Sequence, residues 1–148
     1  MRNGFRIPAT GCLSIFLVGL LFSIGLGSHH CTAAPKGERR IALYNIHTKE
    51  TLDIVYMRNG KRLPEAMKKI NWIARDWRQN EATTMDPKLI DLLWEIREEL
   101  GTREPTHIIS GYRSAKTNNM LRKTRGGQAR KSRHILGKAI DIHFPDIS

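Results

Sequence analysis

Both cysteines of the chain lie in an apolar leader, so the remainder must fold around a hydrophobic core without disulfides. Cys12 and Cys31 are the only cysteines among the 148 residues. Residues 12–27 form an uncharged apolar run that follows a short basic segment, and small residues precede position 33. This order predicts a secretory signal peptide that is cleaved after Ala33. The residues beyond it suffice for one small domain and offer no thiolate as metal ligand or nucleophile.

We therefore predict a signal peptide over residues 1–33, a linker over residues 34–40 and one domain over residues 41–148. A retained membrane anchor is the alternative for the leader. Its apolar run of 16 residues is shorter than the roughly 20 residues that a helix needs to cross a bilayer. This length favours cleavage and export to the periplasm or cell envelope, with no stable membrane span afterwards.

The first half of the domain predicts a hairpin and two helices. Apolar residues 41–46 and 51–57 flank a short polar turn, which is a hairpin pattern. Pro64 opens one helix, while Asp86 begins a second helix that stops at Gly101. The helical stripes that we expect to be buried are Leu63, Met67, Ile70, Ile73 and Trp77, then Leu89, Leu92, Leu93, Ile96 and Leu100.

The second half adds two strands around a third helix. The sequence predicts a buried strand over residues 107–110 and a helix over residues 115–123. Side chains of residues 138–144 would alternate between two faces, which predicts a second strand. Strands, helices and strands in this order predict an α+β fold, with a small mixed sheet and flanking helices. On the last strand, Ala139, Asp141 and His143 share one face, and Ile140, Ile142 and Phe144 share the other.

A basic segment interrupts this pattern between the third helix and the last strand. The chain has a formal net charge of +11, and six Lys or Arg side chains fall within residues 122–133. Such a cluster suggests nucleic acid in the cytosol. For an exported chain we expect no nucleic-acid partner, and the available anions are stem-peptide carboxylates of peptidoglycan, anionic lipid and wall polymers. A solvated loop that keeps the protein soluble is the alternative.

His134 and Asp141 are the candidate metal ligands. Gly137 between them permits a tight turn, so both side chains can reach one ion at about 2.0–2.2 Å. Catalytic zinc normally has three protein ligands and a water. The spacing alone favours a plain surface histidine and a turn-capping aspartate.

Two motifs together favour the metal interpretation. Ser110-Gly111-Tyr112-Arg113-Ser114 precedes Ser132-x-His134-x-x-Gly137-x-Ala139-x-Asp141 by about twenty residues. This pair resembles the LAS/M15 zinc peptidases of bacterial cell walls, above all the murein endopeptidase K-like branch (DUF882). The resemblance runs from about residue 41 to the last residue. It implies the fold of the Hedgehog and D-Ala-D-Ala peptidases.

The resemblance also implies roles for single residues. His134 and Asp141 match the first two ligands of a Zn²⁺ cofactor. Arg113 matches a catalytic arginine that contacts the substrate near the scissile carbonyl, and Ser132 matches a substrate-binding serine beside a carboxylate. For Arg113, a structural salt bridge is the alternative.

In the family, a helix and a hairpin after the aspartate carry a third zinc ligand and the carboxylate that acts on the water. The sequence ends at Ser148, so the resemblance implies a C-terminally truncated domain that lacks these elements. We then expect the face of Ile140, Ile142 and Phe144 to be exposed. His143 is an alternative third ligand, although a core or supporting role fits it better.

The resemblance implies a zinc-dependent peptidoglycan (murein) endopeptidase that cleaves peptide cross-links in the bacterial cell wall. The alternative is a catalytically inactive, truncated wall-binding remnant of such an enzyme. Nucleic-acid binding would explain the charge, but neither the leader nor the paired motifs.

Overall fold

The computed structural model describes residues 37–147. The predicted signal peptide lies outside these residues, as do both cysteines. Within residues 37–147, no helix combines the length and the apolar character that crossing a membrane requires.

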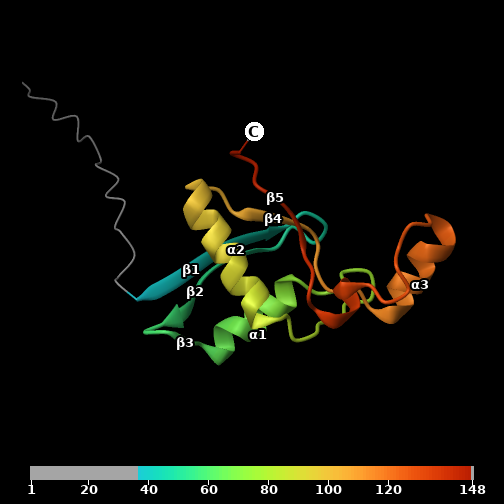
Figure 1. Ribbon diagram of the computed structural model, residues 1–148, viewed down its shortest axis with the longest axis horizontal. Helices are drawn as coiled ribbons and strands as arrows, with labels where there is room; N and C mark the ends of the chain where they lie inside the picture. Colours follow the sequence, from blue (N-terminus) through green and yellow to red (C-terminus); the bar gives the residue numbers. More distant parts are fainter. Residues whose placement is uncertain (1–36, 148) are drawn as a thin grey trace, which may run out of the picture. The chain divides into compact units, whose positions relative to one another are not determined.

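A five-stranded mixed sheet forms the centre of the described domain (Figure 1). The strand order is β3-β2-β1-β4-β5, in which β1 and β4 are parallel and the other neighbours are antiparallel. The predicted hairpin is therefore confirmed, and so is the α+β class. The strands are β1 (Glu38–Asn45), β2 (Thr51–Arg58), β3 (Lys61–Arg62), β4 (Thr106–Ser110) and β5 (Asp141–His143).

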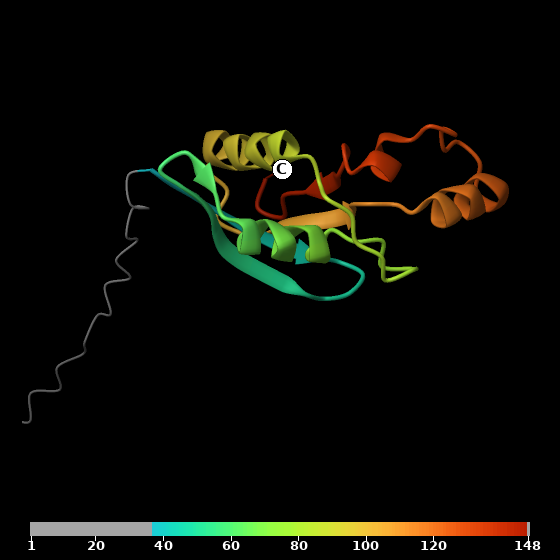
Figure 2. The ribbon, with the colours of Figure 1, turned by 90° about the horizontal axis from the view of Figure 1, so that it is seen from below.

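Helices α1 (Pro64–Ile73) and α2 (Pro87–Leu100) cover one face of this sheet (Figure 2). The Asp86 side chain caps α2 by accepting a hydrogen bond from the Lys88 amide, and Gly101 ends α2 in the left-handed conformation. Helix α3 (Ala115–Thr124) and the 3-10 helix η1 (Arg133–Leu136) follow β4. Both predicted caps of the second helix are thus confirmed.

The core lies between the sheet and these two helices. Alternate residues of β1, β2 and β4 point into it, as the strand period requires. The helices contribute side chains that recur at helical spacing. The buried residues that meet there include Ile41, Leu43, Tyr56, Ile70, Ile73, Ile90, Leu93 and Ile108.

Three residues of the predicted stripes are exposed. Trp77 is 39% exposed because α1 ends at Ile73, so Trp77 lies in the following loop. Leu92 is 50% exposed because α2 turns Ile90 and Leu93 toward the sheet instead. Leu100, the last residue of α2, is also exposed.

The strand boundaries differ from the prediction at both ends. Strand β1 begins at Glu38 and so includes part of the segment expected as a linker. Strand β5 covers only Asp141–His143. The expected exposure of Ile140, Ile142 and Phe144 is wrong, because pairing of β5 with β4 brings all three against the core, where they are partly buried.

Candidate metal and substrate site

His134 and Asp141 face each other across the gap between η1 and β5. The distance from His134 Nε2 to Asp141 Oδ2 is 3.5 Å. His134 Nδ1 lies 2.8 Å from the carbonyl oxygen of Gly111. A backbone carbonyl at that nitrogen holds its proton and leaves the Nε2 lone pair free, which is the usual arrangement of a ligating histidine. We call His134 and Asp141 the metal pair.

The geometry of the metal pair fits a zinc ion. Two ligand atoms at about 2.0–2.1 Å from a tetrahedral ion are roughly 3.4 Å apart, close to the observed separation of 3.5 Å. Within residues 37–147, no group of three or more His, Cys, Asp or Glu side chains gathers around one point. His143 does not join the metal pair in such a group, and its ring lies 6.0 Å from that of His107. The structure thus places His134 and Asp141 at a separation that two zinc ligands would have, and it does not bring His143 to them.

Two glycines position the histidine. Gly137 ends η1 with φ of 63°, and a Cβ there would lie 2.7 Å from the Thr84 carbonyl oxygen. A Cβ on Gly111 would lie only 2.2 Å from the Ala74 carbonyl oxygen. Both positions therefore require glycine, one for its backbone angle and both for close approach of another backbone. The predicted tight turn at Gly137 is confirmed.

Arg113 and Ser132 both contact the histidine through the backbone. The Arg113 amide donates to the His134 carbonyl oxygen at 3.2 Å, and the Arg113 Nη2 donates to Ser110 Oγ at 3.2 Å. In residues 37–147 the structure gives Arg113 no carboxylate partner, so the salt-bridge alternative is not supported. Ser132 is 9% exposed, and its Oγ accepts a hydrogen bond from the His134 amide at the start of η1.

The buried Asp76 ties the loop after α1 to the start of α3. Its side chain accepts hydrogen bonds from the backbone amides of Arg78 at 3.1 Å and Ser114 at 3.0 Å. Burial alone raises the pKa of the Asp76 carboxyl, but the neighbouring polar groups of Thr117 and Ser114 outweigh it and lower the pKa overall. An ionised Asp76 thus fixes the segment that follows Arg113. Sequence reasoning missed this residue, because no motif marks it.

A hollow of about 220 Å³ adjoins Ser110 and Arg113. Its lining also includes His47, Arg78 and Arg125, to which the sequence assigns no role. Arg125 belongs to the basic segment, and His47 and Arg78 lie in segments that the family resemblance covers. We call this space the arginine hollow.

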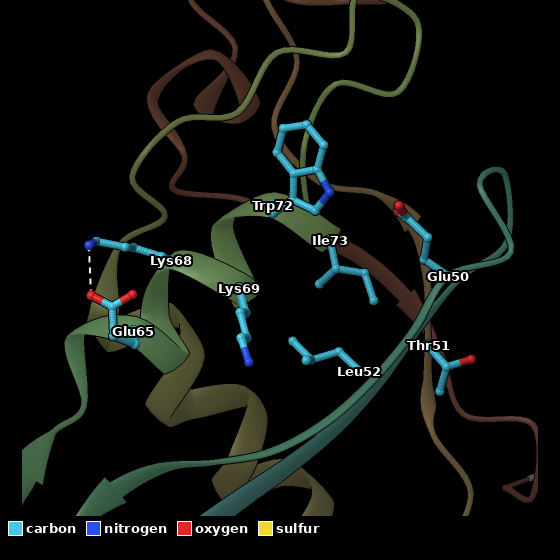
Figure 3. Close-up of a pocket in the computed structure, with 8 residues that line it drawn as sticks. All are labelled: Glu50, Thr51, Leu52, Glu65, Lys68, Lys69, Trp72 and Ile73. Carbon is cyan, nitrogen blue, oxygen red and sulfur yellow. Dashed lines mark hydrogen bonds and ion pairs between the residues drawn. The ribbon is translucent and has the colours of Figure 1, made fainter.

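A separate hollow of about 350 Å³ lies between α1 and the beginning of β2 (Figure 3). Leu52 and Ile73 point into it, and the half-exposed Trp72 stands at its rim. None of the candidate residues lines this space. It is therefore not part of the candidate site.

Comparison with known proteins gives a result that agrees with the site geometry. The sequence profile of the family described as peptidoglycan L,D-endopeptidase MepK (Peptidase_M15_2) matches residues 33–148. Peptidoglycan L,D-endopeptidase MepK of Escherichia coli K12 is 40% identical over 110 residues, which are 74% of this chain and 60% of that protein. The probable peptidoglycan L,D-endopeptidase MepK of Haemophilus influenzae is 37% identical over 110 residues, 74% of this chain and 59% of that protein.

The chain therefore spans about 60% of the length of these curated relatives. No solved structure matches it. The profile covers the whole described domain, including both motifs and the metal pair. This chain belongs to the Peptidase_M15_2 family of peptidoglycan L,D-endopeptidases.

Proposed function

We propose that this chain is a zinc-dependent peptidoglycan endopeptidase that cleaves peptide cross-links in the bacterial cell wall. The observation that carries the proposal is the metal pair, whose donor atoms lie 3.5 Å apart in a member of a peptidoglycan endopeptidase family. The relatives are named L,D-endopeptidases, and we propose the same class of bond for this chain. The predicted leader supports export to the periplasm or cell envelope.

In this proposal His134 Nε2 and Asp141 Oδ2 hold the zinc ion. Zinc supplies Lewis acidity to a scissile peptide carbonyl. The Gly111 carbonyl holds the proton on His134 Nδ1 and thereby keeps Nε2 directed toward Asp141. The rigid turn at Gly137 keeps the two side chains within reach of each other.

Arg113 is the proposed catalytic arginine. Its guanidinium carries a permanent positive charge and is steadied by Ser110 Oγ. It would donate hydrogen bonds to the carbonyl oxygen as negative charge develops there, which is where fixed donors contribute most. Ser132 is the proposed substrate-binding serine, on the basis of the family motif and its place beside His134.

Wall binding without turnover is the second candidate function. It is favoured by the basic segment, in which all six Lys and Arg residues between positions 122 and 133 are exposed. Such a surface attracts the carboxylates of stem peptides whether or not a bond is cut.

Digestion of purified sacculi by the full chain, with zinc or with a chelator, tests these functions. We expect zinc-dependent release of muropeptides in which a peptide cross-link has been opened, and its loss in Asp141→Asn. Arg103→Gln, which removes an exposed charge outside the basic segment, should release muropeptides at nearly the wild-type rate. If the chain sediments with sacculi but releases no muropeptides at any zinc concentration, wall binding without turnover is established instead.

A further inference from the structure

The arginine hollow gathers positive charge beside the metal pair. The guanidinium-bearing residues Arg78, Arg113 and Arg125 line one space of about 220 Å³, together with His47. They come from the loop after α1, the motif before α3 and the end of α3. Three cations from distant parts of the chain thus face a common volume.

No carboxylate pairs directly with these arginines. Across residues 37–147, none of the three makes an ion pair with a carboxylate. Burial lowers the pKa of Arg78, the nearby charge of Asp76 raises it, and the charges of Arg125 and Arg113 lower it. Asp76 is therefore the nearby anion, but its side chain bonds backbone amides, and an external anion would relieve the repulsion among the three cations.

Arg78 is also held in place in advance. Its guanidinium lies over the Trp77 ring, 4.2 Å from the centroid, and its backbone amide donates to the buried Asp76. The His47 ring also stacks on Trp77, with the ring centroids 4.5 Å apart and the ring planes inclined by 22°. A side chain that is ordered before binding loses little conformational entropy when a ligand arrives.

The arginine hollow and the metal pair share one backbone segment. Ser110 and Arg113 line the hollow, while Gly111 between them accepts the hydrogen bond of His134. The Arg113 amide also donates to the His134 carbonyl oxygen. A substrate held at the metal pair would therefore extend a neighbouring group into the hollow.

We propose that Arg78, Arg113 and Arg125 form a subsite for a free carboxylate of the stem peptide, next to the bond that is cut. The inference rests on the proposed function and adds Arg78 and Arg125 as substrate-binding residues. A carboxylate fits because guanidinium groups bind it through two parallel hydrogen bonds. Stem peptides present such carboxylates beside their cross-links, so the hollow would set which end of the peptide enters first.

Binding of a stem tripeptide, L-Ala-γ-D-Glu-meso-diaminopimelate, to the full chain tests this subsite without requiring turnover. Trp77 serves as the fluorescent reporter, and Trp77→Phe identifies its share of the signal. The probes are the free tripeptide, the same tripeptide with amidated carboxylates, and inorganic phosphate. Arg78→Gln and Arg125→Gln are compared with Arg103→Gln, which removes the same charge outside both the hollow and the basic segment. Thermal melting checks that each variant is folded.

We expect amidation, Arg78→Gln and Arg125→Gln each to weaken tripeptide binding by roughly 10-fold or more, the usual effect of losing a hydrogen bond to a charged group. Arg103→Gln should change it less than about twofold. Equal affinity for the amidated tripeptide, or equal weakening in Arg103→Gln, would overturn the proposal. Tighter binding of phosphate would overturn the carboxylate assignment. Muropeptide release tests the proposed function separately. If Arg78→Gln binds the tripeptide as tightly as the wild type while the wild-type chain cleaves sacculi, only the subsite is refuted.

Discussion

His134 is the residue on which the most contacts of the site converge. Its ring nitrogen Nδ1 lies by the Gly111 carbonyl, its carbonyl accepts from the Arg113 amide, and its amide donates to Ser132. The two motifs of the sequence are therefore bonded to each other through this one histidine. Small changes in either motif should move the ring.

Replacing Gly111 with alanine should disturb the site and the fold together. The new Cβ would lie 2.2 Å from the Ala74 carbonyl oxygen, and the Gly111 segment cannot yield without moving His134, whose ring bonds the Gly111 carbonyl. We expect a loss of about 2–4 kcal/mol in the free energy of unfolding, as for other overpacked sites, measured by urea denaturation. Gly126→Ala is the control, because a Cβ there meets open space and costs only the strain of its φ of 69°, about 1 kcal/mol. Equal losses in both variants would contradict the close approach at Gly111.

Asp76→Asn should lower stability in a pH-dependent way. The folded-state pKa of Asp76 is below its ordinary value of 3.8, so its contribution is present above that pH and is lost as the pH falls through the folded pKa. We expect a loss of about 2 kcal/mol at pH 7, from weaker hydrogen bonds to the Arg78 and Ser114 amides. Urea unfolding at pH 7, 5, 4 and 3 should show that the difference in unfolding free energy between wild type and variant narrows below about pH 4. A difference that stays constant down to pH 3 would refute an ionised Asp76.

At the scale of elements, the sequence predicts the hairpin, the helix caps and the order of strands and helices. These features depend on local chemistry, such as the Asp86 cap and the Gly101 stop. The prediction is wrong for Trp77 and Leu92, whose exposure depends on where α1 ends and how α2 is rotated against the sheet. It is also wrong for the exposure of Ile142, because pairing between β4 and β5 is a contact between distant segments.

One partly buried ion pair joins the segments next to two of these elements. Arg75, whose side chain is 8% exposed, follows α1 and donates two hydrogen bonds to Glu50, just before β2, at 2.6 and 3.1 Å. The hydrogen bond from Arg75 is the largest of several effects on the pKa of the Glu50 carboxyl, and it lowers that pKa. The pair therefore fixes the end of α1 to the hairpin.

Glu50→Gln should cost about 1–2 kcal/mol of unfolding free energy, because it leaves the buried Arg75 guanidinium without its counter-charge. The matched control is Glu65→Gln. Glu65 pairs with Lys68 at 2.7 Å, but both side chains are more than 70% exposed, so the loss should be under about 0.5 kcal/mol. Thermal and urea unfolding of both variants measure the difference. Similar losses of unfolding free energy in the two variants would show that burial of Arg75 adds nothing to the stabilisation by its ion pair.

At the scale of the whole described domain, the candidate site is assembled from loops at the ends of several elements. The family resemblance carried by the two motifs predicts His134, Asp141, Arg113 and Ser132 as site residues. It does not predict Arg78 or His47, because their place beside Arg113 is a property of the folded chain. Site residues that belong to one motif can be predicted from the sequence. Site residues that only come together on the surface of the folded chain can be identified only from the structure.

That His134 and Asp141 hold one zinc ion is tested most directly by zinc titration of the full chain with a chelating competitor. The metal pair predicts one zinc ion per chain, with the affinity reduced by at least about 100-fold in His134→Ala and in Asp141→Ala, since each removes a ligand. His143→Ala, which lies on the same strand as Asp141, should leave the affinity within about threefold. Zinc binding that is unchanged by either ligand variant, or no binding by the wild-type chain, would contradict the assignment.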